Sequence, residues 1–178
     1  MKRALLAVGM FVVVCVMVVQ AQAPQVPKPG AEHKKMDVFL GTWTYEGEAK
    51  KSPFGPAGKV TGTEVFETLG GLFLQDRWDE KNPLGAVKGI QMWGYDSAKK
   101  TYTYNYFSTL GEMGSGTMTV SGNTWSWTGS GITYEGKTAY GRGSLTFASP
   151  TSYTVKGEAS ADGKTWALGF EGKWTKSR

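Results

Sequence analysis

The stretch Phe39-Leu40-Gly41-Thr42-Trp43-Thr44-Tyr45 marks a change from helical to strand periodicity. Before it, apolar residues recur from Met36 onward at the spacing of one helix face. Gly41 supplies the permissive backbone with which helices commonly end. After Gly41, apolar and polar residues alternate, as they do in a strand with one buried face. The sequence therefore predicts a short helix that ends at Gly41, followed by a strand whose buried face begins with Trp43.

The first residues of the chain have the pattern of a secretory signal peptide. Lys2 and Arg3 precede a run of uncharged, largely apolar residues that extends from position 4 to position 19. We expect cleavage after Ala21, because cleavage after Ala23 would leave a proline as the first mature residue. Residues 1–21 are then a signal peptide, and the protein is exported, either periplasmic or secreted. An uncleaved anchor is the alternative, although the apolar run falls short of the roughly 18 to 20 residues that span a bilayer.

The rest of the chain is predicted to form one domain behind a short tether. Residues 22–30 contain three prolines and predict an extended segment, and residues 31–178 are enough for one domain with its own core. Cleavage removes the only cysteine, Cys15, so no disulfide and no cysteine nucleophile is expected. It also lowers the formal net charge from +5 to +3. The lysines are scattered and form no basic stripe, so we do not expect a nucleic-acid partner.

Ten segments beyond the helix have strand character. They are residues 43–49, 59–69, 72–80, 87–96, 101–108, 116–120, 124–130, 137–147, 152–159 and 165–175. Short turn signals such as Gly70-Gly71 and Asp162-Gly163 make neighbouring strands antiparallel. Closing such a meander on itself removes exposed strand edges. The sequence predicts an all-β, up-and-down antiparallel barrel of about ten strands with one short N-terminal helix. A two-sheet sandwich is the alternative.

The motif Gly41-Thr42-Trp43 at the start of the first strand resembles the lipocalin and calycin signature. That resemblance implies a tryptophan that closes the barrel floor and a basic side chain from late in the chain that packs across it. Arg142, Lys173 and Lys176 all qualify by position. Four further blocks extend the likeness: Ser52-Pro53-Phe54-Gly55-Pro56, Gly70-Gly71, Gly94-Tyr95-Asp96 and Ser160-Ala161-Asp162-Gly163-Lys164-Thr165-Trp166. From about Lys35 to Lys176 the chain resembles a bacterial lipocalin-like family of unknown function, DUF family 1579, which implies a barrel without an established activity.

One catalytic pattern occurs in full. Residues 131–138 fit the phosphate-binding sequence G-x-x-x-x-G-K-[ST], but that loop functions only when it opens a helix. The residues after Thr138 favour a strand, so we interpret the match, including Lys137, as accidental. The only histidine, His33, lies on the leading helix, which argues against a histidine-ligated haem or a multi-histidine metal site. The sequence predicts no catalytic residue, no metal ligand and no cofactor.

The predicted third strand places an ionisable group inside the barrel. Either Asp76 faces inward together with Trp78, or Arg77 does, and a buried charge is costly unless it is paired. Aromatic rings with polar tips, separated by small residues, suit a flat or amphipathic small molecule. The candidate ligand-binding residues are Trp43, Tyr45, Phe54, Asp76, Arg77, Trp78, Gln91, Trp93, Tyr104 and Arg142.

Phe54 lies between Pro53 and Pro56 in a connection with restricted backbone freedom. We predict that its ring forms a lid over the barrel mouth, opposite the connection at residues 110–113, because functional groups often lie on loops held by a rigid scaffold. A plug that packs into the barrel is the alternative.

These features predict an exported barrel that binds a small hydrophobic or amphipathic molecule and has no stable membrane span after cleavage. A cofactor-free barrel enzyme of the isomerase or cyclase type is one alternative. A structural or interaction module of the cell envelope is the other. The sequence defines neither the ligand nor the oligomeric state.

Overall fold

The chain leads into the fold through a short helical segment, α1 (Ala31–Lys35), which tightens into the 3₁₀ turn η1 (Met36–Phe39). This computed structural model describes residues 27–177. The predicted signal peptide and most of the predicted tether lie outside the described residues. Within residues 27–177, no helix has both the length and the apolar character needed to cross a membrane.

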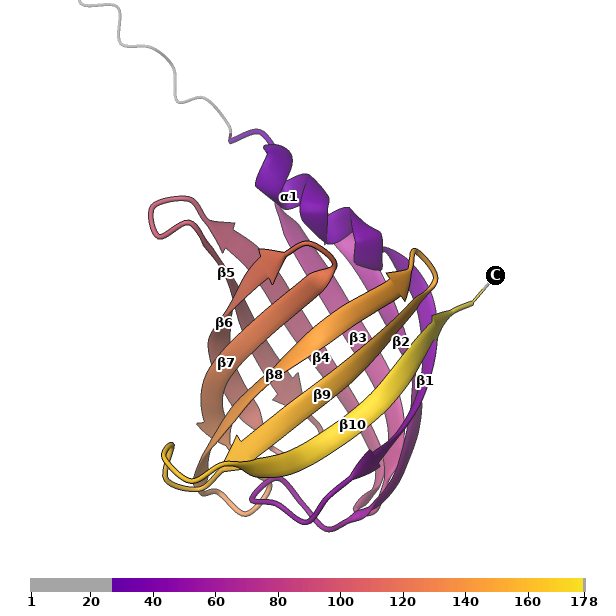
Figure 1. Cartoon of the computed structure of the whole chain (residues 1–178), viewed down its shortest axis with the longest axis vertical. Coiled ribbons are helices and arrows are strands. Elements are labelled where there is room, and N and C mark those ends of the chain that lie inside the picture. Colours follow the sequence, from indigo (N-terminus) through magenta and orange to yellow (C-terminus); the bar gives the residue numbers. More distant parts are fainter. Residues whose placement is uncertain (1–26, 178) are drawn as a thin grey trace, which may run out of the picture.

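Within residues 27–177, ten antiparallel strands follow the helical segment (Figure 1). They are β1 (Gly41–Ala49), β2 (Gly58–Leu69), β3 (Phe73–Asn82), β4 (Gly85–Asp96), β5 (Thr101–Ser108), β6 (Met113–Ser121), β7 (Thr124–Ile132), β8 (Thr138–Ser149), β9 (Ser152–Ser160) and β10 (Ala167–Lys176). Each strand pairs with its neighbours in the sequence, and β1 pairs with β10 to close the barrel. The predicted up-and-down barrel is confirmed, and the two-sheet sandwich is wrong.

The last strand differs from its predicted form in two ways. It begins at Ala167 and not at residue 165, because the Asp162 carboxylate accepts the backbone N–H groups of Lys164 and Thr165, both at 2.8 Å, and holds a loop. These hydrogen bonds lower the pKa of Asp162 to about 2. A register shift between Leu168 and Phe170 then moves the preceding residues off the inner face. The alternation of Trp166, Leu168 and Phe170 predicts one shared buried face, but Trp166 instead stacks against the exposed Arg142 side chain, so this prediction is wrong.

Phe39 closes the barrel at the end where the helical segment lies. Its ring is fully buried and packs against five aromatic rings from five strands, all with centroids within 5.9 Å. These rings belong to Phe66, Trp93, Trp125, Phe147 and Tyr153. Trp43, also fully buried, donates its indole N–H to the Phe39 carbonyl oxygen at 2.6 Å. The helix-to-strand junction thus forms an aromatic floor.

Lys176 is the basic side chain that packs across this floor. Its ammonium nitrogen lies 5.1 Å from the centroid of the Trp43 ring, within the range of a cation–π contact. Gly41 lies beneath the same side chain with φ at +112°, a backbone conformation that favours glycine. Of the three basic residues compatible with the lipocalin resemblance, the structure selects Lys176.

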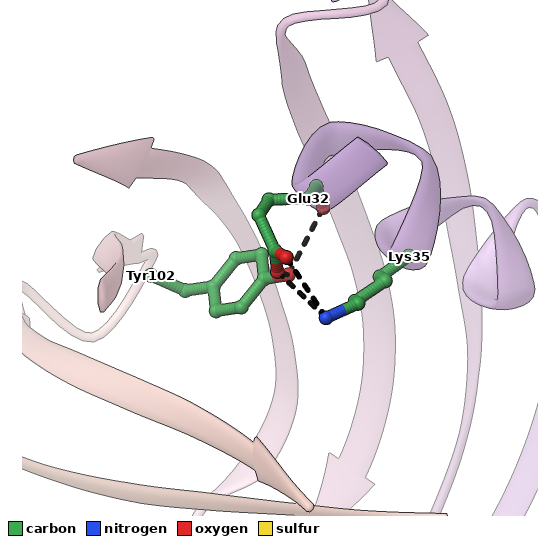
Figure 2. Close-up of polar contacts among 3 residues, drawn as sticks. All are labelled: Glu32, Lys35 and Tyr102. Carbon is green, nitrogen blue, oxygen red and sulfur yellow. Dashed lines mark hydrogen bonds and ion pairs between the residues drawn. The ribbon is translucent and has the colours of Figure 1, made fainter. Parts of the chain in front are cut away.

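A polar cluster holds the helical segment against the barrel end. Figure 2 shows the Tyr102 side chain of β5 reaching Glu32 of α1, where its hydroxyl donates to the carboxylate at 2.8 Å. Lys35, one turn further along, pairs with the same carboxylate at 2.9 Å. The helix therefore covers one barrel opening, and any access to the interior must come from elsewhere.

Candidate ligand-binding cavity

Above the aromatic floor, the barrel encloses a cavity of about 450 Å³. Its walls extend from Phe66 and Trp93, next to the floor, to residues at the far end of the barrel. Those far-end residues include Phe54 in the β1–β2 connection and Glu112 in the β5–β6 connection. The cavity therefore runs from the floor to the end of the barrel opposite the helix, and its volume lies in the range of small-molecule sites.

Glycines on the inner face keep the centre of the barrel open. The Trp127 ring lies against Gly141 and Gly143 of the next strand, and the Trp78 ring lies against Gly89. A Cβ atom at any of these glycines would overlap the ring beside it. Because the rings lie along the wall, they line the cavity without filling it. Glycines in strand interiors often mark such close approaches.

Two carboxyl groups meet near the bottom of the cavity. Asp76 of β3 is 1% exposed, and Glu64 of β2 is half-buried and faces the cavity. The strand register places them at diagonal positions on adjacent strands, and their side chains share a hydrogen bond. Glu64 Oε2 also accepts the Trp174 indole N–H at 2.6 Å and the Tyr153 hydroxyl at 3.1 Å.

Asp76 and Glu64 differ in the hydrogen bonds that favour their charged forms. Burial raises the pKa of Asp76 well above its usual value, and the negative charge of Glu64 raises it further. Burial also raises the pKa of Glu64, but hydrogen bonds donated by Asp76, Trp174 and Tyr153 favour its charged form. We therefore assign the proton to Asp76, which donates it to the Glu64 carboxylate.

Two buried polar atoms near the bottom of the cavity, one of them in Asp76 itself, have no hydrogen-bond partner among the described residues. They are Asp76 Oδ1, an acceptor, and Trp93 Nε1, a donor, and Trp93 is 4% exposed. Asp76 pairs with Gln91 across the sheet and Leu74 pairs with Trp93, so the two unpaired atoms come from diagonal neighbours on β3 and β4. Buried polar groups are usually paired, and each exception calls for a physical explanation.

Two further carboxyl groups lie higher on the wall. Glu80 accepts the Tyr45 hydroxyl and the Asn82 side-chain amide, each at 2.8 Å. Glu112, near the open end, accepts the Ser108 hydroxyl at 3.0 Å, and burial raises its pKa. No lysine, arginine or histidine lines the cavity within the part of the chain that the structure describes. The polar groups of the wall are thus mainly acidic.

The predicted lid residue lies at the open end. Phe54 is half-buried and lines the cavity. Its turn is held by reciprocal backbone hydrogen bonds between Ser52 and Gly55, and the Phe54 N–H donates to the Ser52 hydroxyl at 3.2 Å. On the β5–β6 side, Ser108 and Glu112 line the cavity, while Leu110 does not. A rigid turn therefore holds the ring at the opening, and its function as a lid stays a prediction.

Seven of the ten candidate residues line this cavity: Tyr45, Phe54, Asp76, Trp78, Gln91, Trp93 and Tyr104. The other three do not, and their assignment to the cavity is corrected. Trp43 lies in the floor below. Arg77 lies on the outer face and pairs with Glu67 at 2.6 Å, because the inward phase of β3 is the one that carries Asp76. Arg142 also lies outside, where it pairs with Glu158 at 2.6 Å and stacks on Trp166.

Glu64 is the main residue that sequence reasoning missed. It alternates with Val60 and Phe66, both buried, so the period of two along β2 would have placed it on the inner face. Its partners Tyr153 and Trp174 lie 89 and 110 residues away in the sequence. Only the closure of the barrel brings them together.

The remaining sequence features do not contribute to the cavity. Lys137 ends an exposed turn, pairs with Glu135 at 2.7 Å and precedes strand β8, not a helix. His33 accepts the backbone N–H of Gly30 and lies edge-on against Tyr95. Within residues 27–177, no group of three or more histidine, cysteine, aspartate or glutamate side chains is placed to hold a metal ion.

A closed antiparallel barrel with an aromatic floor, a basic residue across its tryptophan and an interior cavity defines a lipocalin-like protein. The chain belongs to the family described as "Protein of unknown function (DUF1579)", whose profile matches residues 28–176. No curated protein sequence matches the chain significantly.

Two solved structures share the fold. The crystal structure of Rv2717c from M. tuberculosis is 14% identical with a TM-score of 0.61, and the match covers 85% of this chain and 100% of that chain. The S-type phycobiliprotein lyase CPES from Guillardia theta is 10% identical with a TM-score of 0.54, and the match covers 83% and 93%. At these identities, the likeness shows the barrel architecture alone.

Proposed function

We propose that the protein is exported and binds a small hydrophobic or amphipathic molecule in the barrel cavity. One observation carries this proposal: the cavity of about 450 Å³ has apolar and aromatic walls and two unpaired polar atoms near its floor. Apolar sites with a few oriented polar groups are typical of small-molecule binding. Export is supported by the basic residues Lys2 and Arg3 followed by the apolar run at 4–19.

An open interior also favours a binding protein over a purely structural module. A barrel that served only as a rigid envelope module would be expected to fill its core with side chains, as small barrels do. Here inner-face glycines such as Gly129 and Gly141 let the Tyr104 and Trp127 side chains lie along the wall, and a cavity of about 450 Å³ remains.

A matched pair of variants tests the proposal. Val155 lines the cavity, and Thr154, the preceding residue on β9, is exposed. Val155→Trp should fill the cavity and abolish the fluorescence increase of the neutral apolar dye Nile red. Thr154→Trp should leave the increase unchanged. Equal dye binding by both variants would show that the dye binds outside the barrel.

Glu64 and Asp76 support a second candidate function, that of a cofactor-free isomerase or cyclase. A protonated acid beside a carboxylate at the bottom of a cavity is an arrangement used in general acid–base catalysis. The donors Trp174 and Tyr153 stabilise the Glu64 carboxylate, however, and this makes it a weaker base. Binding is therefore the better-supported function. If turnover of a bound compound is found, Asp76→Asn should abolish turnover and retain binding.

A further inference from the structure

The charge inside the barrel has the opposite sign to the charge of the chain. The chain carries a formal net charge of +5, yet the charged side chains on the cavity wall are carboxyl groups, with no basic side chain among the described lining residues. Some basic residues on the neighbouring strands are exposed and pair with surface carboxylates. Examples are Arg77 with Glu67 and Lys88 with Asp79. The described lining residues therefore bring carboxyl groups into the cavity without a basic side chain to pair with them.

We propose that the ligand is a cationic amphiphile whose protonated amine lies beside Glu64 and Asp76 at the bottom of the cavity. This inference rests on the proposed function and names the chemical class of the ligand. The apolar body of the ligand would extend toward the open end near Phe54.

The geometry of Glu64 supports this orientation. The residue lines the cavity and is half-buried, so its charge is partly accessible from the interior. The carboxylate accepts hydrogen bonds from the Trp174 indole and the Tyr153 hydroxyl. Both donors are neutral, so they stabilise the carboxylate without cancelling its charge. A bound ammonium group supplies the missing positive charge in a site where water screens the attraction less than at the surface.

The two unpaired polar atoms define the head of the ligand further. Asp76 Oδ1 is an acceptor that an ammonium N–H can satisfy. Trp93 Nε1 is a donor and requires an acceptor on the ligand. Because Asp76 and Trp93 are diagonal neighbours across two strands, one small head group can reach both. An amine with a hydroxyl or carbonyl oxygen on the adjacent carbon supplies both the donor for Asp76 Oδ1 and the acceptor for Trp93 Nε1.

The aromatic wall suits the same class of ligand. Trp127, Tyr104 and Phe170 line the cavity above the acidic pair. Their ring faces provide apolar contact for the body of the ligand, and aromatic faces also attract cations during entry. A fatty carboxylate, by contrast, would meet the negative charge of Glu64, with no lysine or arginine among the described lining residues to bind it.

Three probes with the same apolar chain test this inference: decylamine, decanol and decanoate. Each is titrated into the protein in competition with Nile red, and the tryptophan fluorescence is recorded as a second signal. We expect decylamine to bind on the order of tenfold or more tighter than decanoate, with decanol between them, because hydrogen bonds to charged groups contribute that much to affinity. The positive net charge of the protein would favour the opposite order, so non-specific adsorption cannot produce this result.

A double variant tests whether Glu64 and Asp76 cause the preference for decylamine. Glu64→Gln with Asp76→Asn keeps the shapes of both side chains and removes the negative charge that the pair carries. The double change is needed because either carboxyl group, left alone, could take up that charge. It should bring the affinities for decylamine and decanol within about threefold of each other. Glu46→Gln removes one exposed carboxylate on the outer face of β1 and should leave the three affinities unchanged.

A further probe tests the contact with Trp93. Decylamine with a hydroxyl group on the carbon adjacent to the amine-bearing carbon should bind tighter than decylamine itself, and Trp93→Phe should remove that gain in affinity.

The possible outcomes separate the inference from the proposed function. Equal binding of the three probes by the unmodified protein, or tighter binding of decanoate, would overturn the cationic ligand and leave the cavity function in place. A preference for decylamine that survives in the double variant would also overturn it. Failure of all three probes and of Nile red would remove both proposals. The ranking on the unmodified protein decides the matter even if the double variant does not fold.

Discussion

The buried acid Asp76 makes stability depend on pH in a way that one substitution should remove. Asp76→Asn replaces a protonated carboxyl group with an amide of the same shape, which can still donate a hydrogen bond to Glu64. In the unfolded chain, by contrast, Asp76 ionises with its ordinary pKa of about 3.9. The native protein therefore holds a proton that the unfolded chain releases. Stability from this group is complete at low pH and falls as the pH rises toward the raised native pKa.

The size of this pH effect follows from the release of one proton when the protein unfolds. Between the two pKa values, the free energy of unfolding of the original protein should fall by up to about 1.4 kcal/mol per pH unit relative to Asp76→Asn. Relative to the original protein, the variant should thus be about equally stable near pH 4 and progressively more stable toward pH 7. For a chain of this size, each 1 kcal/mol corresponds to roughly 2 to 4 °C in Tm. The ionisable groups that interact with Asp76 are Glu64, Tyr45 and Tyr153, and burial raises the pKa of both tyrosines, so they stay neutral over this pH range.

Urea unfolding at a series of pH values measures this difference. Asp79→Asn is the matched control, because Asp79 lies on the same strand, faces outward and pairs with Lys88 at the surface. It should cost less than about 1 kcal/mol with no comparable pH dependence. If Asp76→Asn destabilised the protein by a constant amount at every pH, Asp76 would be ionised in the native state and the assignment of the proton would be wrong.

Three further substitutions test other parts of the structure. Trp43→Ala should lower the free energy of unfolding by about 3 to 5 kcal/mol, because it empties a fully buried site in the floor; a shift of only a degree or two in Tm would contradict this assignment. Phe54→Ala should weaken Nile red binding by roughly 1 to 2 kcal/mol and barely move the unfolding midpoint, whereas a large loss of stability with intact dye binding would identify Phe54 as a plug. Lys137→Ala should leave stability unchanged in thermal unfolding, and calorimetry should detect no saturable ATP binding to the original protein that the variant lacks.

The barrel could be predicted because its determinants are local. The alternation that begins at Trp43 and recurs between turn signals identifies strands, and closure follows because a long meander otherwise leaves edges unpaired. The helix-to-strand change at Gly41 is also local, and the structure confirms it with a positive φ at that residue.

The candidate site was harder to predict because it depends on contacts across strands. Both phases of β3 place an ionisable residue inside the barrel, and its own sequence gives no means of choosing between Asp76 and Arg77. The structure places Leu74 and Asp76 on the inner face, where Asp76 meets Glu64 of the adjacent strand, a contact that the sequence of β3 alone does not contain. For the same reason, position in the sequence could not separate Lys176 from Arg142. The register shift in β10 sends Trp166 outward, and Arg142 packs against it there.

Native mass spectrometry of the protein purified from its own compartment tests the central claim most directly. If the cavity binds a small molecule, the unmodified protein should carry a discrete added mass that collisional activation releases, and Val155→Trp should lack it. Thr154→Trp should retain the added mass. If the unmodified protein and both variants showed only the mass of the polypeptide, with no uptake of added Nile red, the cavity would not be a binding site.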